Sequence, residues 1–152
     1  FNHQDSYETE KHINMLRFTI LFACLLGITL GDGGLFPMTE EEIEKCMPLQ
    51  NGMDIAVEQL NMKNDRKEND YRLVRTETIK ASKQVVTGVL YRVHVTMEES
   101  VCQNVEGNKY KGLTDCPTKG NGQNKDCVFT IWSRPWMKKF GKDLLIKGIN
   151  CN

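Results

Sequence analysis

Residues 71–97 read YRLVRTETIKASKQVVTGVLYRVHVTM, and this stretch decides the fold. Side chains of alternating polarity run on both sides of residues 86–88, where Val, Thr and Gly interrupt the alternation. A period of two is typical of β-strands, and a Gly between two such runs can adopt the positive φ of a tight turn. The stretch therefore predicts two long antiparallel strands, 71–86 and 89–98, joined by a short turn.

The flanking segments predict one helix before this hairpin and two strands after it. Four apolar residues spaced by three and four share one helix face: Met53, Ala56, Val57 and Leu60. This spacing predicts a helix over 48–63, with a Pro in its first turn. Residues 99–126 are rich in Gly, Asn and Lys and predict a long loop, while period-two segments at 127–133 and 143–149 predict strands. One helix followed by an antiparallel meander of about four strands is an α+β fold, with the helix covering one face of the sheet.

Length and composition narrow the classes of protein. The chain has 152 residues, with 20 Lys and Arg against 20 Asp and Glu. That length allows one compact domain. A net charge of zero provides no excess positive charge to attract nucleic acid. A hydrophobic content of 39% is too high for a disordered chain. We therefore expect a single globular domain with no nucleic-acid partner.

Residues 15–31 have the layout of a secretory signal peptide. Arg17 lies at its start, residues 18–30 are apolar and uncharged, and small residues follow. A transmembrane helix needs ~20 apolar residues, and no run in the chain reaches that length, so we expect a secreted, extracellular protein with no membrane segment. We interpret residues 1–14 as upstream sequence translated in frame, the alternative being a genuine N-terminal extension. The working domain is then 32–152.

Five cysteines fall in this domain: Cys46, Cys102, Cys116, Cys127 and Cys151. Disulfides form and persist in the secretory compartment. Because Cys102 and Cys116 lie at the ends of the long loop, and Cys127 and Cys151 at the outer ends of two strands expected to pair, we expect the disulfides Cys102–Cys116 and Cys127–Cys151. Spacing alone allows other pairings. Cys46 is left over, and it either links a disulfide-bonded homodimer or stays free.

The sequence shows no motif typical of a catalytic or metal site. His94 is the only His in the domain, and no Cys lies near it at the spacing of a zinc site. A nucleophilic pair of Cys46 and His94 would need a proximity that nothing in the sequence predicts. Residues 120–122 read as loop glycines, with no strand before them as a phosphate loop requires. We expect no enzyme activity, no cofactor and no metal.

Two short motifs lie at the turns of the expected hairpins. The first consists of Gln84, Val85, Val86, Thr87 and Gly88, and the second of Pro135 and Trp136. A tip with Val side chains and a Gly makes a narrow apolar edge, and a Trp fixed by a Pro makes a rigid anchor for binding. Taken singly, each motif also fits a purely structural alternative, with the two Val in an ordinary strand and Trp136 in the core.

Taken in order with the helix, the four paired Cys, the signal peptide and an N-terminal Gly, these motifs resemble the type 2 (secreted) cystatin family over nearly all of 33–152. The resemblance implies an antiparallel sheet wrapped around one long helix. It implies reversible, non-covalent inhibition of papain-like cysteine proteases, such as cathepsins of the L, B and S types. The protease-binding wedge would consist of Gly33 or Gly34, the loop 84–88, and Pro135 with Trp136. Near-neutrality fits such a binder, because apolar loop tips need no charged patch to steer them.

The chain departs from the family pattern at its N-terminus. Leu35 and Phe36 separate Gly34 from Pro37, whereas the family often has Gly directly before Pro. We expect cleavage after Gly31, so that only Asp32 would precede the Gly pair, with cleavage after Thr29 as the alternative. We therefore expect that trimming the chain to Phe36 costs little affinity.

Two alternatives to simple protease inhibition stay open. Some type 2 cystatins also inhibit the asparagine-specific protease legumain through an Asn that follows the helix, and Asn69 and Asn64 are the candidates here. Neither has the usual preceding Ser, and Asn-Asp is ordinary turn chemistry. The other alternative is a non-inhibitory cystatin-fold module for binding or signalling.

Overall fold

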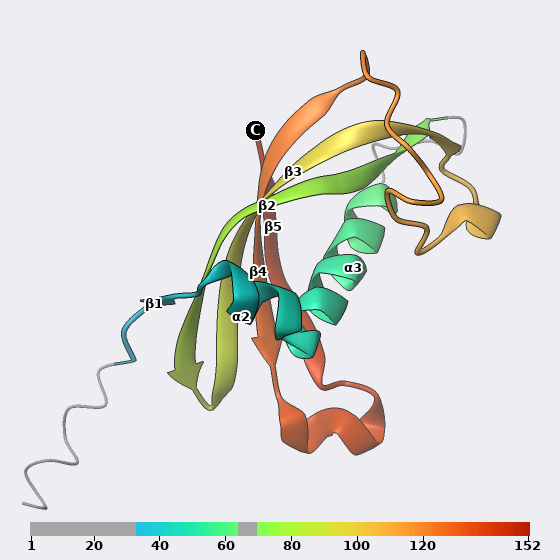
Figure 1. Cartoon of the computed structure of the whole chain (residues 1–152). Helices are drawn as coiled ribbons and strands as arrows, with labels where there is room; N and C mark the ends of the chain where they lie inside the picture. The colour runs from blue at the N-terminus through green and yellow to red at the C-terminus, as the bar shows by residue number, and fades with distance from the viewer. Residues whose placement is uncertain (1–32, 64–69) are drawn as a thin grey trace, which may run out of the picture. The chain divides into compact units, whose positions relative to one another are not determined.

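The computed structural model describes residues 33–63 and 70–152 (Figure 1). Its elements in chain order are β1 (Phe36–Pro37), α2 (Glu40–Lys45), α3 (Met47–Asn61), β2 (Tyr71–Val86), β3 (Gly88–Gln103), the 3₁₀-helix η1 (Glu106–Asn108), β4 (Asn124–Ser133), the 3₁₀-helix η2 (Pro135–Phe140) and β5 (Leu144–Cys151). The expected signal peptide and the segment before it, as well as Asn64 and Asn69, lie outside the described residues. None of the helices in the described ranges is long and apolar enough to cross a bilayer.

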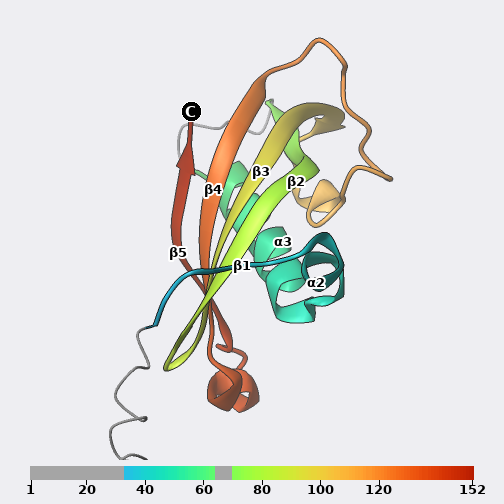
Figure 2. The ribbon, with the colours of Figure 1, turned by 60° about the vertical axis from the view of Figure 1, so that its left-hand side comes forward.

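The strands form one antiparallel sheet in the order β1-β2-β3-β4-β5. The sheet curves around α3, which lies along its concave face (Figures 1 and 2). This arrangement confirms the α+β fold with an antiparallel sheet wrapped around one long helix. The expected meander corresponds to β2 through β5, and the two-residue strand β1 adds a fifth strand.

The core lies between α3 and the sheet. The helix contributes Leu49, Met53, Ala56 and Leu60, and the sheet contributes Val93, Val95, Met97, Phe129 and Ile131, all of them buried. Burying each large apolar side chain contributes about 1.5–3 kcal/mol. At Gly52 the helix approaches the sheet so closely that a Cβ atom would lie 2.5 Å from Cγ2 of Ile131. The absence of a side chain at Gly52 therefore lets α3 pack closely against β4.

The acidic stretch before α3 forms a helix of its own, which the sequence did not predict. Thr39 Oγ1 accepts a hydrogen bond from the Glu42 backbone N–H (3.2 Å), and Glu42 Oε2 accepts one from the Thr39 N–H (3.0 Å). This capping box begins α2, and Pro48 is accommodated in the first turn of α3. Lys83 Nζ donates to Glu42 Oε1 (2.7 Å), so α2 is attached to β2. The hydrogen bond from Lys83, followed by that from the Thr39 N–H, lowers the pKa of Glu42.

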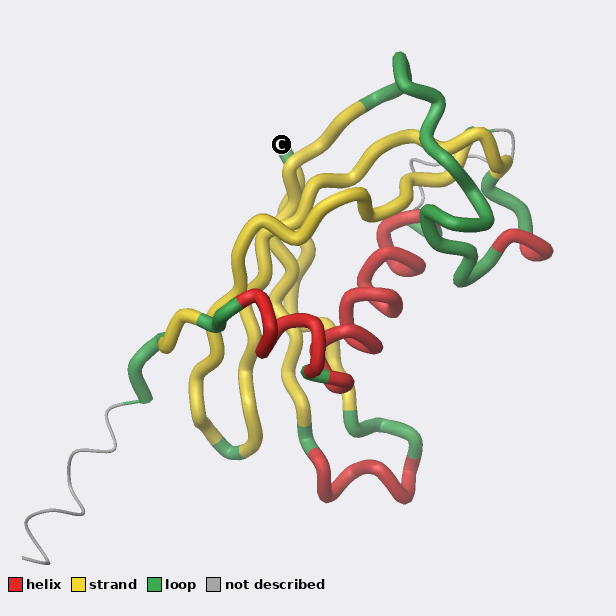
Figure 3. The backbone as a smooth tube through the Cα atoms, viewed as in Figure 1, coloured by secondary structure: helices red, strands yellow, loops and turns green. Residues whose placement is uncertain are grey.

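The long loop is shorter than expected, because β3 extends to Gln103 and β4 begins at Asn124. Figure 3 shows it at one end of the sheet, with the β2–β3 turn and η2 at the other. The structure has the disulfides Cys102–Cys116 and Cys127–Cys151, with Cα–Cα distances of 5.5 and 4.1 Å. These are the two pairs that the topology led us to expect.

Candidate functional site

Two loops meet at the end of the sheet that carries the β2–β3 turn, and the N-terminal segment is directed toward the same end. Val86 pairs with Gly88 across that turn, and Val89 pairs with Ser133, the last residue of β4. The β4–β5 connection, which contains η2, therefore lies directly beside the β2–β3 turn (Figure 1). On the other side, β1 pairs with Lys83 and Ser82 of β2. Because this pairing is antiparallel, the chain before β1 runs toward the same tip.

The first of these segments, Gln84–Gly88, presents apolar side chains to solvent. Val85 is 66% exposed and Val86 is 41% exposed. Both flanking strands are 16 residues long and hydrogen-bonded to each other, so they hold the tip in one conformation. Less conformational freedom is then lost when a partner binds it.

The first segment packs closely against the second at Gly88. Its φ is +89°, a conformation that favours glycine. A Cβ atom on Gly88 would lie 2.2 Å from the Ser133 carbonyl oxygen and 3.1 Å from Cη2 of Trp136. The Trp136 ring therefore lies against the turn of the first hairpin, and the two motifs form one surface.

The second segment is a rigid loop. The Arg134 N–H donates to the Asp143 carbonyl (2.6 Å) and closes the loop at its base. Pro135 opens η2, and Gly141, with a φ of +64°, ends it. Trp136 is 48% exposed, so the bland expectation of a core Trp is wrong.

Sequence reasoning missed Trp132, which links the two segments. Its indole Nε1–H donates to the Thr87 carbonyl (2.8 Å), so β4 holds the tip of the first hairpin. Arg134 and Lys147 lie over its ring, at 5.0 and 5.6 Å from the centroid. Trp132 alternates with the buried residues Phe129 and Ile131, and an aromatic residue on the outward face one step before a turn was the signal available.

The N-terminal glycines lie shortly before β1, separated from it by Leu35. Gly34 is exposed, as are Leu35 and Phe36 that follow it. The Met38 N–H donates to the Ala81 carbonyl (2.9 Å), so this segment is held to β2 just after β1. Gly33 precedes Gly34 in the chain.

Cys46, the free cysteine of the described residues, lies between α2 and α3. Its Sγ donates to the Tyr91 hydroxyl (3.4 Å), and its side chain is partly buried against the core. Burial, followed by the interaction with Cys46, raises the pKa of Tyr91. The thiol therefore has an internal partner.

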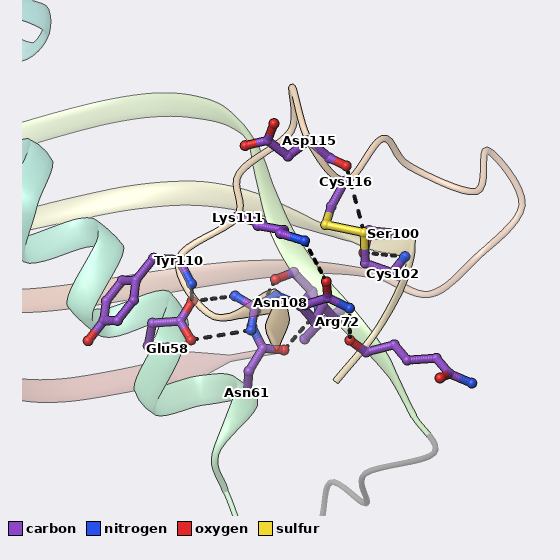
Figure 4. The surroundings of a disulfide bond; sticks show 12 residues. Glu58, Asn61, Arg72, Ser100, Cys102, Asn108, Tyr110, Lys111, Asp115 and Cys116 are labelled. Atoms are coloured by element: carbon purple, nitrogen blue, oxygen red, sulfur yellow. Dashed lines mark hydrogen bonds and ion pairs between the residues drawn. A yellow bond between two sulfur atoms is a disulfide. The ribbon is translucent and has the colours of Figure 1, made fainter. Parts of the chain in front are cut away.

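The opposite end of the sheet carries a buried polar network (Figure 4). Arg72 is 1% exposed and forms an ion pair with Glu58 of α3. Glu58 Oε1 also accepts the Tyr110 N–H (2.9 Å), and Asn104 Nδ2 donates to the Asn61 carbonyl (2.7 Å). The long loop is thus anchored to the helix, far from the exposed tips.

No group of three or more His, Cys, Asp and Glu side chains within residues 33–63 and 70–152 is arranged to hold a metal ion. What the tip offers a partner is an exposed apolar edge with a Trp beside it. Such a surface can bind and block, and it brings together no nucleophile and base for chemistry.

Comparisons with known proteins agree on one family. Residues 41–136 match the family model of the Cystatin domain. Similar proteins include the cystatin of Tropidechis carinatus, 28% identical over 128 residues (82% of this chain, 86% of the relative), and cystatin-1 of Crotalus adamanteus, 29% identical over 126 residues (79% and 81%). Dimeric human cystatin F has a similar structure, with a TM-score of 0.58 and 19% identity over 79% of this chain and 86% of that one. A salivary cystatin of the soft tick Ornithodoros moubata has the same TM-score and identity, over 79% and 97%. Since these structural likenesses show the fold and the family model spans more than half of the sequence, the chain belongs to the cystatin family, whose members are generally cysteine protease inhibitors.

Proposed function

We propose that this protein is a secreted, reversible, non-covalent inhibitor of papain-like cysteine proteases such as cathepsins. One observation carries the proposal: the Trp136 ring lies against Gly88, so the two motifs form a single exposed edge narrow enough to enter a protease cleft. The family, whose members generally inhibit cysteine proteases, supports the same activity.

In this mechanism the protein blocks the cleft and performs no chemistry. Val85 and Val86 supply the apolar edge of the first loop, and Trp136, oriented by Pro135, supplies the anchor of the second. Aromatic anchors of this kind usually dominate interface energy, at 2 kcal/mol or more. Gly33 or Gly34 would act as the N-terminal hinge of the wedge after removal of residues 15–31.

The hydrogen bond between Cys46 and Tyr91 favours a free thiol over a disulfide-linked homodimer. A solved relative is described as dimeric human cystatin F, so the oligomeric state deserves a direct test. Non-reducing electrophoresis of the secreted protein should give a monomer. A dimer abolished by Cys46→Ser would show that the thiol pairs between chains.

Titration of papain and a cathepsin L-type protease tests the proposal. The wild type should inhibit both, and Trp136→Ala should weaken inhibition by about 30-fold or more, which corresponds to about 2 kcal/mol. Val86→Asp should weaken it as well, because a charge would enter an apolar cleft. Val105→Asp is the matched control, since Val105 is 40% exposed but belongs to the opposite end of the sheet.

Each variant must keep its cooperative thermal unfolding for the comparison to hold. No inhibition by micromolar wild-type protein would contradict the proposal. It would support the alternative of a non-inhibitory cystatin-fold module for binding or signalling.

A further inference from the structure

The net charge of zero conceals an uneven distribution of charges. Residues 134–147 contain five basic side chains, Arg134, Lys138, Lys139, Lys142 and Lys147, and a single acidic one, Asp143. The four lysines are exposed. Among the ion pairs within the described part of the chain, none involves these five cations. The acidic residues that balance them lie elsewhere, including four Glu in α2.

These cations surround the anchor of the proposed wedge. Lys138 and Lys139 belong to the same six-residue 3₁₀-helix as Trp136. The Arg134 Nη2–H donates to the Lys142 carbonyl (2.6 Å), which brings the two sides of the loop together. Arg134 and Lys147 flank the Trp132 ring that holds the first loop.

The first loop is different, because residues 84–91 carry no charged side chain. Lys83, just before it, is neutralised by Glu42. The nearest other exposed cation is Arg92, which lies further along β3 opposite Ser82, so positive charge at the tip is concentrated on the second-loop side of the wedge. At physiological salt, charges act over about 8 Å, so the loop cations would sense the protease surface next to the bound Trp136.

We infer that the basic second loop, residues 134–147, selects papain-like proteases whose cleft is bordered by acidic side chains. This inference rests on the proposed function and extends it to the class of target. Rim charges mainly accelerate association and change its salt dependence, with little effect on dissociation. A basic rim on a protease would instead repel the loop.

The test measures association and dissociation rates against two papain-like proteases of known structure, one with an acidic cleft border and one with a neutral border. The loop variant is Lys138→Gln/Lys139→Gln/Lys142→Gln. The control variant, Lys63→Gln/Lys111→Gln/Lys125→Gln, removes the same charge from residues at the opposite end of the molecule. Rates are measured at ~50 and ~300 mM salt, where screening differs strongly.

With the acidic-border protease at low salt, the loop variant should associate about tenfold more slowly than wild type, and the control should stay within about twofold. The difference should shrink at high salt, dissociation should change little, and the neutral-border protease should show no such difference. Equal association rates for the two variants would overturn the inference while leaving inhibition intact. Equal rates together with loop-dependent retention on heparin would overturn it in favour of a sulfated-glycan partner. Absence of inhibition by the wild type would instead show that the proposed function itself is wrong.

Discussion

Gly88 satisfies two structural requirements that no other residue type satisfies together, a positive φ and close packing at the place where a Cβ atom would lie. Its φ of +89° is unfavourable for any residue with a Cβ, and the space that a Cβ would occupy is filled by the Ser133 carbonyl and the Trp136 ring. The positive φ could be predicted from the sequence, because a Gly between two period-two runs predicts a turn. The close packing against Ser133 and Trp136 could not be predicted, because it depends on β4 pairing with β3 in one particular register.

Gly88→Ala should therefore damage inhibition more than stability. The methyl group must push the first loop away from Ser133 and Trp136, and we expect inhibition of papain to weaken by at least about tenfold, since the two loops no longer share one edge. Gly120→Ala is the control, because Gly120 has a φ of +75° but open space around it. Both variants should lose ~1 kcal/mol of stability from the backbone conformation. Gly88→Ala should lose more than Gly120→Ala, because only its methyl group would clash with the Ser133 carbonyl. Equal inhibition by the two variants would contradict the packing of the loops.

Among the helices and strands, the local sequence pattern predicted those that local interactions determine. The strand 71–86 matches β2, and the helix 48–63 lies close to α3, because long periodic segments bury one face. The short elements β1, α2 and η2 were not predicted. α2 begins with the local capping box of Thr39 and Glu42, and Lys83 only attaches it to β2. β1 exists through its pairing with Lys83 and Ser82 of β2, more than 40 residues away, which a local pattern cannot reveal. For the same reason Trp132 was missed, since its role depends on the Thr87 carbonyl.

The Glu58–Arg72 ion pair joins α3 to β2, and Glu58 also holds the long loop through the Tyr110 N–H, so the pair should be costly to break. Arg72→Met would leave the buried carboxylate of Glu58 without its cation, and we expect a loss of about 3–5 kcal/mol in the free energy of unfolding in urea. Adding Glu58→Leu should recover part of this loss but not all, because the Tyr110 N–H would lose its acceptor.

The control for this pair is Lys45→Met, which breaks the ion pair with Glu41 on the surface of α2. Lys45 is 75% exposed, so the expected change is within about 1 kcal/mol. A loss as small as this in Arg72→Met would mean that the network does not anchor the long loop.

At the scale of the whole molecule, binding and stability belong to opposite ends of one sheet. The exposed loops lie beyond Val86 and Ser133, whereas both disulfides and the Arg72 network lie toward the other end (Figure 1). The strands between them are long, so a change at one end is separated from the other by a hydrogen-bonded sheet. This division gives a prediction that neither end would give alone.

Removing the first disulfide, with Cys102→Ser/Cys116→Ser, should lower the free energy of unfolding by about 3 kcal/mol and leave inhibition of papain unchanged. The loss follows from the greater freedom of the unfolded chain when the 14-residue separation is no longer closed. Cys46→Ser serves as the control, because a hydroxyl can still donate to Tyr91. A fall in inhibition that accompanies the disulfide variant would mean that the two ends are coupled.

The outer edge of β2 has a consequence for self-association. β1 covers it only at Ser82 and Lys83, but at the far end the side-chain amide of Asn61 bonds both the N–H and the C=O of Leu73, at 2.9 Å each, as a neighbouring strand would. Between these two positions, the register of β2 shifts at two places, between Arg75 and Glu77 and between Thr78 and Lys80. A straight strand from a second copy would find this edge capped at both ends and bent in the middle, and edges of that kind are poor templates for fibrils. The long hairpin can therefore expose its tip to a partner while its side offers a second copy few places at which to add a strand.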